Sequence, residues 1–165
     1  TKKVVEDARA KGVTVEAELG TVGGKEDGHS AEIAYTDPAE ALDFFTRTGV
    51  DIFAVAIGTA HGFYKGEPKL DVERLSQIRA KVSVPLVLHG TSGVPDDVVR
   101  DCIRRGICKV NYATDLRIAY TKAVRQTLEN DPAIIDPKKF GAAGRKTVQA
   151  CVEGRIRVCG SEGKA

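Results

Sequence analysis

Residues 85–93 read PLVLHGTSG, a short apolar run followed directly by a polar, glycine-rich segment. Such an apolar run is typical of a strand buried on both faces of a parallel sheet. A histidine and a glycine-rich turn follow at once, and Pro95 then opens a predicted helix. The stretch therefore predicts a strand, a polar loop and a helix, with the polar groups at the carboxyl end of the strand.

Similar units flank this stretch on both sides. Apolar or alternating runs predict further strands at 13–19 (VTVEAEL), 53–58 (FAVAIG) and 108–114 (CKVNYAT). Capping residues, glycine stops and apolar stripes predict helices over 2–11, 37–49, 71–82, 95–106, 115–129 and 138–154. Helices and strands therefore alternate along the chain, with short loops between them.

This alternation argues for parallel strands joined by crossover helices. Four βα units are half of an eight-fold barrel, so we expect an α/β fold of the TIM (βα)8 barrel family with a helical tail. Residues 1–165 contain no linker-like segment, and we expect a single domain. An open doubly wound sheet is the alternative that the pattern leaves open.

Composition argues against several classes of protein. The net charge is +2, basic residues are dispersed and aromatic residues make up 5%, so we expect no nucleic-acid partner. The sequence has no run of 18 or more apolar residues and no signal-peptide pattern, so we expect no membrane span. Its four cysteines form no C-x-x-C pair, which favours reduced thiols in a cytoplasmic protein.

Two histidines follow neighbouring predicted strands, where a barrel carries its chemistry. His61 lies in the loop GTAHGFYKG and His89 in the loop HGTSG. Neutral imidazole is a common ligand of zinc and similar metals, and a catalytic zinc site has three protein ligands. The pair therefore predicts a metal site, with His29 as a weaker candidate for a third ligand. Two structural, hydrogen-bonded histidines are the alternative.

The last two loops have features of a phosphate site. Residues 90–93 (GTSG) offer glycine amides and two hydroxyls, and residues 111–114 lead directly into a helix whose free N–H groups attract anions. Ordinary turn chemistry is the alternative for each loop alone. The two loops together, at adjacent strand ends, predict a phosphate-binding site.

Three carboxylates also need an explanation. Glu16 and Glu18 share the face of a predicted strand that points into a barrel, where an unpaired charge is costly. They should pair with Lys, Arg or a metal, and a structural ion pair is the plainest possibility. Glu26 lies on a glycine-flanked loop, from which a carboxylate can act as a general acid or base when substrate closes the loop.

Four ordered segments together resemble the class II, metal-dependent fructose- and tagatose-bisphosphate aldolases. They are VEAELGTVGGKEDG (15–28), GTAHGFYKGEPKLD (58–71), PLVLHGTSGVPDD (85–97) and KVNYATDLRIAY (109–120). The resemblance covers nearly the whole chain and implies the carboxyl-terminal half of a βα barrel. It also implies a lyase that reversibly cleaves a ketose bisphosphate to dihydroxyacetone phosphate and glyceraldehyde 3-phosphate.

The resemblance further implies roles for individual residues. His61 and His89 would be two of three ligands of Zn²⁺ or another divalent metal, and a monovalent cation such as Na⁺ or K⁺ would bind near Gly62 and Gly90. Glu26 would transfer the proton at the dihydroxyacetone carbon, and Asn111 would steady the enediolate. The substrate would be contacted by Gly62, Lys65, Gly90, Thr91, Ser92, Asn111, Tyr112, Ala113 and Thr114.

One family motif is missing from the sequence. The D-H-H-type segment, which carries the third metal-binding histidine and the proton-donor aspartate, does not occur here. We therefore expect this chain alone to be inactive, to pair with the missing amino-terminal half or with another copy, and to form a dimer or tetramer when complete. A non-catalytic phosphate-binding or assembly subunit of the same barrel family is the alternative.

Overall fold

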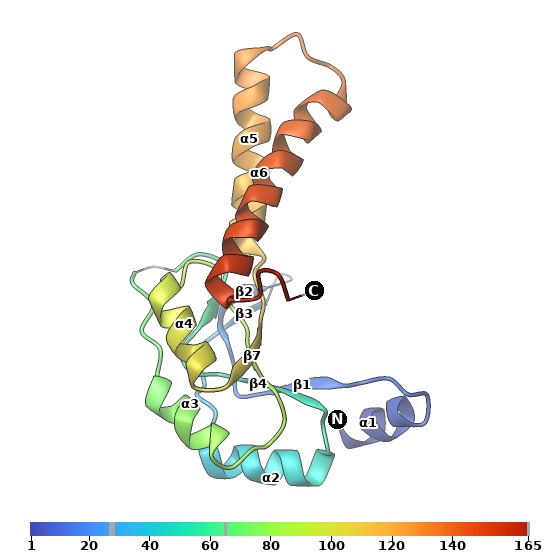
Figure 1. Ribbon diagram of the computed structural model, residues 1–165, viewed down its shortest axis with the longest axis vertical. Coiled ribbons are helices and arrows are strands. Elements are labelled where there is room, and N and C mark those ends of the chain that lie inside the picture. Colours follow the sequence, from blue (N-terminus) through green and yellow to red (C-terminus); the bar gives the residue numbers. More distant parts are fainter. Residues whose placement is uncertain (27–28, 65, 165) are drawn as a thin grey trace. The chain divides into compact units, whose positions relative to one another are not determined.

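The computed structural model describes residues 1–26, 29–64 and 66–164, and for residues 25, 26 and 29–31 it describes the backbone only (Figure 1). The chain divides into two compact units, residues 1–111 and 112–165. The prediction that residues 1–165 form one domain stays a prediction.

A four-stranded parallel sheet is the centre of the first unit. Its strands are β1 (Glu16–Leu19), β4 (Ile52–Val55), β6 (Leu86–Leu88) and β7 (Ile107–Val110), in the order β1-β4-β6-β7. Every strand pairs in parallel with its neighbour. The predicted parallel α/β architecture is confirmed, and all four strands place their carboxyl ends at the same edge of the sheet.

Four helices accompany this sheet, and α2, α3 and α4 follow one another along it in Figure 1. Asp37 caps α2 by accepting hydrogen bonds from the amides of Ala39 and Glu40, and Gly49 ends that helix in the left-handed conformation. These caps confirm the predicted start and stop signals. The helices are α1 (Lys2–Arg9), α2 (Pro38–Thr48), α3 (Val72–Arg79) and α4 (Asp96–Arg104).

The core lies between the sheet and its helices. Phe53 on β4 is fully buried and stacks on Phe44 of α2, with 5.4 Å between ring centroids. Leu75 and Ile78 of α3 are equally buried and belong to the same cluster as Leu86 of β6. The apolar stripe predicted on the helix from Asp71 is therefore the face that covers the sheet.

A second, small sheet forms where the sequence predicted only loops. The hairpin of β2 (Gly23–Glu26) and β3 (His29–Ala31) adds through β2 to β5 (Ala60–His61). Gly24 has φ of 95°, and a Cβ there would overlap the backbone oxygen of His61. The prediction of plain loops was wrong because glycine lets this hairpin approach β5 closely enough to pair with it.

Thr36 joins the carboxyl ends of β1 and β4. Its hydroxyl donates a 2.6 Å hydrogen bond to the carbonyl of Leu19 and accepts a 2.8 Å bond from the amide of Ala56. Thr36 is buried, so both backbone groups would lose their partner if the hydroxyl were removed. The pair of bonds holds together the strand ends from which the polar loops emerge.

The second unit is a pair of helices, α5 (Thr114–Asn130) and α6 (Pro137–Cys159). The Thr147 hydroxyl on α6 donates to the carbonyl of Ala119 on α5 at 3.1 Å. The tail helix predicted over 138–154 continues to Cys159 and ends at Gly160 in the left-handed conformation. Within the described ranges, no helix has the length and apolar character needed to cross a membrane.

Candidate active site

His61 and His89 come together at the carboxyl edge of the parallel sheet. His89 directly follows β6, and His61 ends β5, six residues after the neighbouring strand β4. Their ring centroids are 6.2 Å apart and their planes differ by 34°. With a metal–nitrogen bond of about 2.0–2.1 Å, two imidazole rings on one tetrahedral ion have centres about 5.2 Å apart. The observed spacing is about 1 Å wider, so the two rings lie near each other but must move closer to share one tetrahedral ion.

Two carboxylates contact the His89 ring, one at each ring nitrogen. Nε2 lies 2.9 Å from Oε1 of Glu16, and Nδ1 lies 2.7 Å from Oε2 of Glu18. The hydrogen bond to Glu18 raises the pKa of His89, and the bond to Glu16 adds to this effect against the opposing effect of burial. The pKa of His89 thus lies above its ordinary value, and its charged form is favoured.

Glu16 also binds the side chain of Lys109. The Lys109 Nζ donates to Oε2 of Glu16 at 2.9 Å. Burial by itself would raise the pKa of Glu16, but the hydrogen bonds from Lys109 and His89 outweigh it and leave the pKa below its ordinary value. Among the described residues, the two inward-facing carboxylates therefore have partners. Glu16 is paired with Lys109 and His89, and Glu18 is paired with the same histidine.

The Glu16–Lys109 contact requires a curved sheet. Glu16 lies on β1 and Lys109 on β7, with β4 and β6 between them in the strand order. Neighbouring strands lie about 4.8 Å apart, so the outer strands of a flat sheet would be roughly 14 Å apart. A direct contact between side chains on one face fits a sheet that curls toward that face, as the strands of a barrel do.

Tyr64 fixes the glycine turn after β6. Its hydroxyl donates a 2.8 Å bond to the carbonyl of Gly90 and accepts a 2.9 Å bond from the amide of Ala60. Burial raises the pKa of Tyr64, so the hydroxyl keeps its proton at neutral pH. Gly90 has φ of 63°, and a Cβ there would meet the Ala60 carbonyl oxygen at 2.7 Å. Only glycine fits this close approach of two loops.

The hydroxyl of Thr91 points back to the protein. It donates to the carbonyl of Leu88 at 3.1 Å, and the Thr91 amide donates to the carbonyl of Asn111 at 3.4 Å. Thr91 and its neighbour Ser92 are both buried. The hydroxyl of Thr91 therefore donates its proton to the end of β6 in this structure, and its predicted contact with phosphate stays a prediction.

The other predicted site residues divide into three groups. Gly62 directly follows His61, and Asn111 follows β7 with its amide bonded to the carbonyl of Leu88. Lys65 and the side chain of Glu26 lie outside the described residues. Tyr112, Ala113 and Thr114 belong to the second unit, so their convergence with the turn at 90–93 stays a prediction.

The described donors fit part of a metal site. Two imidazoles, one of them in contact with two carboxylates, are ligand types that zinc and similar divalent ions take. Across residues 1–26, 29–64 and 66–164, however, no group of three or more His, Cys, Asp or Glu is placed to hold an ion. The side chain of His29 is not among those described. His61 and His89 therefore fit two ligand positions, and a third ligand is needed.

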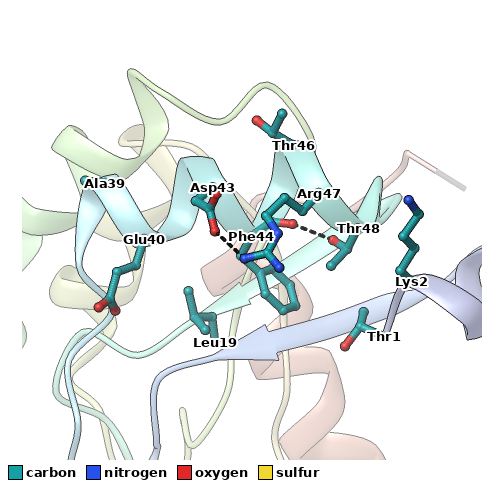
Figure 2. Close-up of a pocket in the computed structure, with 10 residues that line it drawn as sticks. All are labelled: Thr1, Lys2, Leu19, Ala39, Glu40, Asp43, Phe44, Thr46, Arg47 and Thr48. Atoms are coloured by element: carbon teal, nitrogen blue, oxygen red, sulfur yellow. Dashed lines mark hydrogen bonds and ion pairs between the residues drawn. The ribbon is translucent and has the colours of Figure 1, made fainter.

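A hollow of about 970 Å³ lies apart from these residues, beside α2 and the start of the chain (Figure 2). Leu19 and Phe44 line it together with charged side chains such as Asp43 and Arg47, which are joined by a 3.1 Å ion pair. None of the predicted site residues is among the described residues that line it. We therefore do not identify this hollow with the candidate active site, although it is large.

The contacts of Lys109 and Tyr64 were not predicted from the sequence. Lys109 is a charged residue inside a predicted strand, which could have marked it as the partner for an inward-facing carboxylate. Tyr64 lies in GFYKG, a segment with no local feature that predicts a hydrogen bond to a turn 26 residues away. Contacts of this kind depend on the fold and have no periodic pattern.

Comparisons with known proteins identify the family of this chain. The family described as "Fructose-bisphosphate aldolase class-II" matches residues 1–164. Curated proteins named "Fructose-bisphosphate aldolase" from Geobacillus stearothermophilus and from Staphylococcus aureus strain Mu50 are 48% and 45% identical over 100% of this chain. The crystal structure of the YdjI aldolase from Escherichia coli K12 superposes with a TM-score of 0.83 at 39% identity, covering 99% of this chain and 56% of that one.

The comparisons also define how much of the fold is present. The chain spans 58% of the length of the two curated relatives, and the match lies in their carboxyl-terminal part. The parallel sheet with its helices is a portion of the TIM barrel of these aldolases, followed by a helical tail. This chain belongs to the class II fructose-bisphosphate aldolase family.

Proposed function

We propose that this chain is the carboxyl-terminal part of a metal-dependent aldolase of cytoplasmic carbohydrate metabolism. The enzyme reversibly cleaves fructose 1,6-bisphosphate, or tagatose 1,6-bisphosphate, to dihydroxyacetone phosphate and glyceraldehyde 3-phosphate. The 6.2 Å approach of the His61 and His89 rings at the active edge of the sheet is the observation that carries the proposal. The completed enzyme, meaning this chain joined to the amino-terminal segment present in its relatives, forms a homo-oligomer.

His61 and His89 hold a divalent cation together with a ligand from the amino-terminal segment. When bound, such a cation polarises the ketone of the substrate and stabilises the negative charge that develops as the carbon–carbon bond breaks. His89 needs one free ring nitrogen for this role, so one of its two carboxylate contacts must give way. Zinc is the first candidate, because imidazole with neighbouring carboxylate suits it, and cobalt suits the same donors.

Backbone groups of the turn at 90–93 bind the phosphate or ketone end of dihydroxyacetone phosphate. The tight turn at Gly90 is held in place by Tyr64, so its amides are fixed before substrate arrives. Gly62, Lys65, Thr91 and Ser92 belong to the same site, as do residues 111–114. A monovalent cation such as Na⁺ or K⁺ near Gly62 and Gly90 completes the anion-binding region.

Glu26 and Asn111 act on the substrate directly. Glu26 exchanges the proton at the dihydroxyacetone carbon next to the ketone, as a carboxylate within hydrogen-bond reach of that carbon can. The Asn111 side-chain amide donates to the oxygen on which negative charge collects. The backbone of β2, which carries Glu26, pairs with β5, which carries His61, and this pairing supports a common site.

The test is an aldol-cleavage assay on the completed enzyme with each of the two sugar bisphosphates. We expect cleavage that a chelator abolishes and that added zinc or cobalt restores, and we expect His61→Ala to be inactive. Activity that survives EDTA would rule out the metal mechanism. Absence of both activity and bound metal in the completed protein would favour a phosphate-binding or assembly subunit instead.

A further inference from the structure

A row of contacting side chains that includes His89 crosses one face of the curved sheet. Lys109 on β7 contacts Glu16 on β1, Glu16 contacts His89 after β6, and His89 contacts Glu18 on β1, with 2.9, 2.9 and 2.7 Å between the bonded atoms. The row passes over β4, which lies between β1 and β6 in the sheet. Each member therefore restrains the next across strands that are not hydrogen-bonded neighbours.

The two carboxylates that contact His89 are not equivalent. Glu16 uses both of its oxygens, Oε1 toward His89 and Oε2 toward Lys109. Glu18 reaches His89 through Oε2 and stands nearer the carboxyl end of β1. The carboxylate opposite Nε2 is thus anchored by a lysine, whereas the carboxylate opposite Nδ1 lies nearer the carboxyl edge of the sheet, where barrels of this kind bind their ligands.

A metal-binding histidine uses one ring nitrogen for the ion and donates its other N–H to a carboxylate or carbonyl, which fixes the ring orientation and tautomer. On this basis we propose that Glu16 and Lys109 are positioning residues for His89. Glu16 holds the Nε2–H of the ring, Lys109 holds Glu16, and Nδ1 is thereby presented to the divalent cation. The inference rests on the proposed function, because it assumes that His89 is a metal ligand.

An ion pair of purely structural value is the competing explanation. The Lys109 side chain is 48% exposed, and exposed ion pairs contribute about 0–1 kcal/mol to stability. A structural role predicts that loss of Lys109 or Glu16 changes stability and leaves metal affinity alone. A positioning role predicts that the loss of either residue lowers metal affinity more than it lowers stability.

Cobalt(II) binding to the completed enzyme separates the two explanations. The dissociation constant is measured from the visible absorption of the bound ion in the wild type and in Glu16→Gln, Lys109→Met and Lys109→Arg. We expect Glu16→Gln to weaken binding about 10- to 100-fold, Lys109→Met to weaken it less, and Lys109→Arg to stay close to wild type. Asp43→Asn, which breaks an exposed pair with Arg47, is the matched control and should bind cobalt normally.

A second readout follows the ring itself. In ¹⁵N NMR spectra of the zinc-loaded enzyme, we expect a proton on Nε2 of His89 that exchanges slowly in the wild type and faster in Glu16→Gln. Unchanged cobalt affinity in Glu16→Gln, or an His89 ring that carries its proton on Nδ1, overturns the positioning role and leaves the proposed function standing. A wild-type completed enzyme that binds no cobalt overturns the proposed function itself.

Discussion

The hydroxyl of Tyr64 donates a 2.8 Å hydrogen bond to the carbonyl of Gly90, 26 residues away in the chain. The same oxygen accepts from the amide of Ala60, the residue before His61. One side chain therefore joins the loop that carries His61 to the turn that follows His89. The relative placement of two candidate metal ligands and a candidate phosphate turn depends on this contact.

Replacement of Tyr64 by phenylalanine should loosen the turn. Both backbone groups lose a partner, so we expect the free energy of unfolding to fall by about 1–3 kcal/mol and the KM for the sugar bisphosphate to rise more than kcat falls. Urea unfolding and steady-state kinetics of the completed enzyme measure the two effects. Tyr35→Phe is the control, because Tyr35 is exposed and its ring contact with Arg74 is kept. A Tyr64→Phe enzyme with unchanged KM would show that the turn holds its shape without the bond.

Thr36 offers a test of how the strand ends are joined. Thr36→Val keeps the size of the side chain but removes a hydroxyl that bonds Leu19 and Ala56. Each orphaned buried backbone group costs about 1–3 kcal/mol, so we expect a clear loss of stability in urea unfolding. Thr36→Ser retains the hydroxyl and should lose much less. Equal losses in the two variants would assign the effect to packing of the methyl group.

Several parts of the fold could be predicted from local pattern. The alternation in VTVEAEL placed Ala17 and Leu19 toward the core and Glu16 and Glu18 on the opposite face, as the structure has them. Such predictions succeed because the period of a strand or helix is fixed by backbone geometry. The hairpin of β2 and β3 was missed because β2 pairs with residues of β5 that lie 37 positions further along (Gly23 with Ala60), and because its glycines resemble ordinary loop residues.

The types of residue at the site could be predicted from the sequence, but only some of the contacts between them could. Histidines at adjoining strand ends predicted the approach of His61 and His89, since carboxyl ends of parallel strands share an edge. The sequence left open whether Glu16 would meet a lysine, an arginine or a metal. Lys109 is 93 residues away, and only the curvature of the sheet brings the two side chains together.

The raised pKa of His89 predicts a pH dependence of stability in metal-free protein. Because the pKa is higher in the folded chain than its ordinary value of 6.5, protonation of His89 stabilises the fold. This contribution is fully present below about pH 6.5 and is lost as the pH rises through the folded pKa. Urea unfolding over a pH series should show the decline in the wild type and a smaller one in His89→Gln. Parallel curves for the two proteins would mean that Glu16 and Glu18 do not hold a charged imidazole.

The cysteines should differ sharply in reactivity. Cys102 is fully buried, and burial raises the pKa of its thiol to about 11, whereas Cys108 is exposed. The thiolate is the reactive form, so a thiol-specific reagent at neutral pH should label Cys108 and leave Cys102 unmodified until the chain unfolds. Peptide mass spectrometry after brief alkylation identifies the labelled residues. Rapid labelling of Cys102 in folded protein would contradict the packing of α4 on the sheet.

Anomalous diffraction at the zinc edge from crystals of the completed, zinc-loaded enzyme tests the convergence of the two histidines most directly. We expect one strong peak that lies about 2.0–2.1 Å from a ring nitrogen of His61 and equally close to a ring nitrogen of His89. A peak bonded to only one of the two rings, or zinc bound elsewhere with both rings uncoordinated, would contradict a shared metal site.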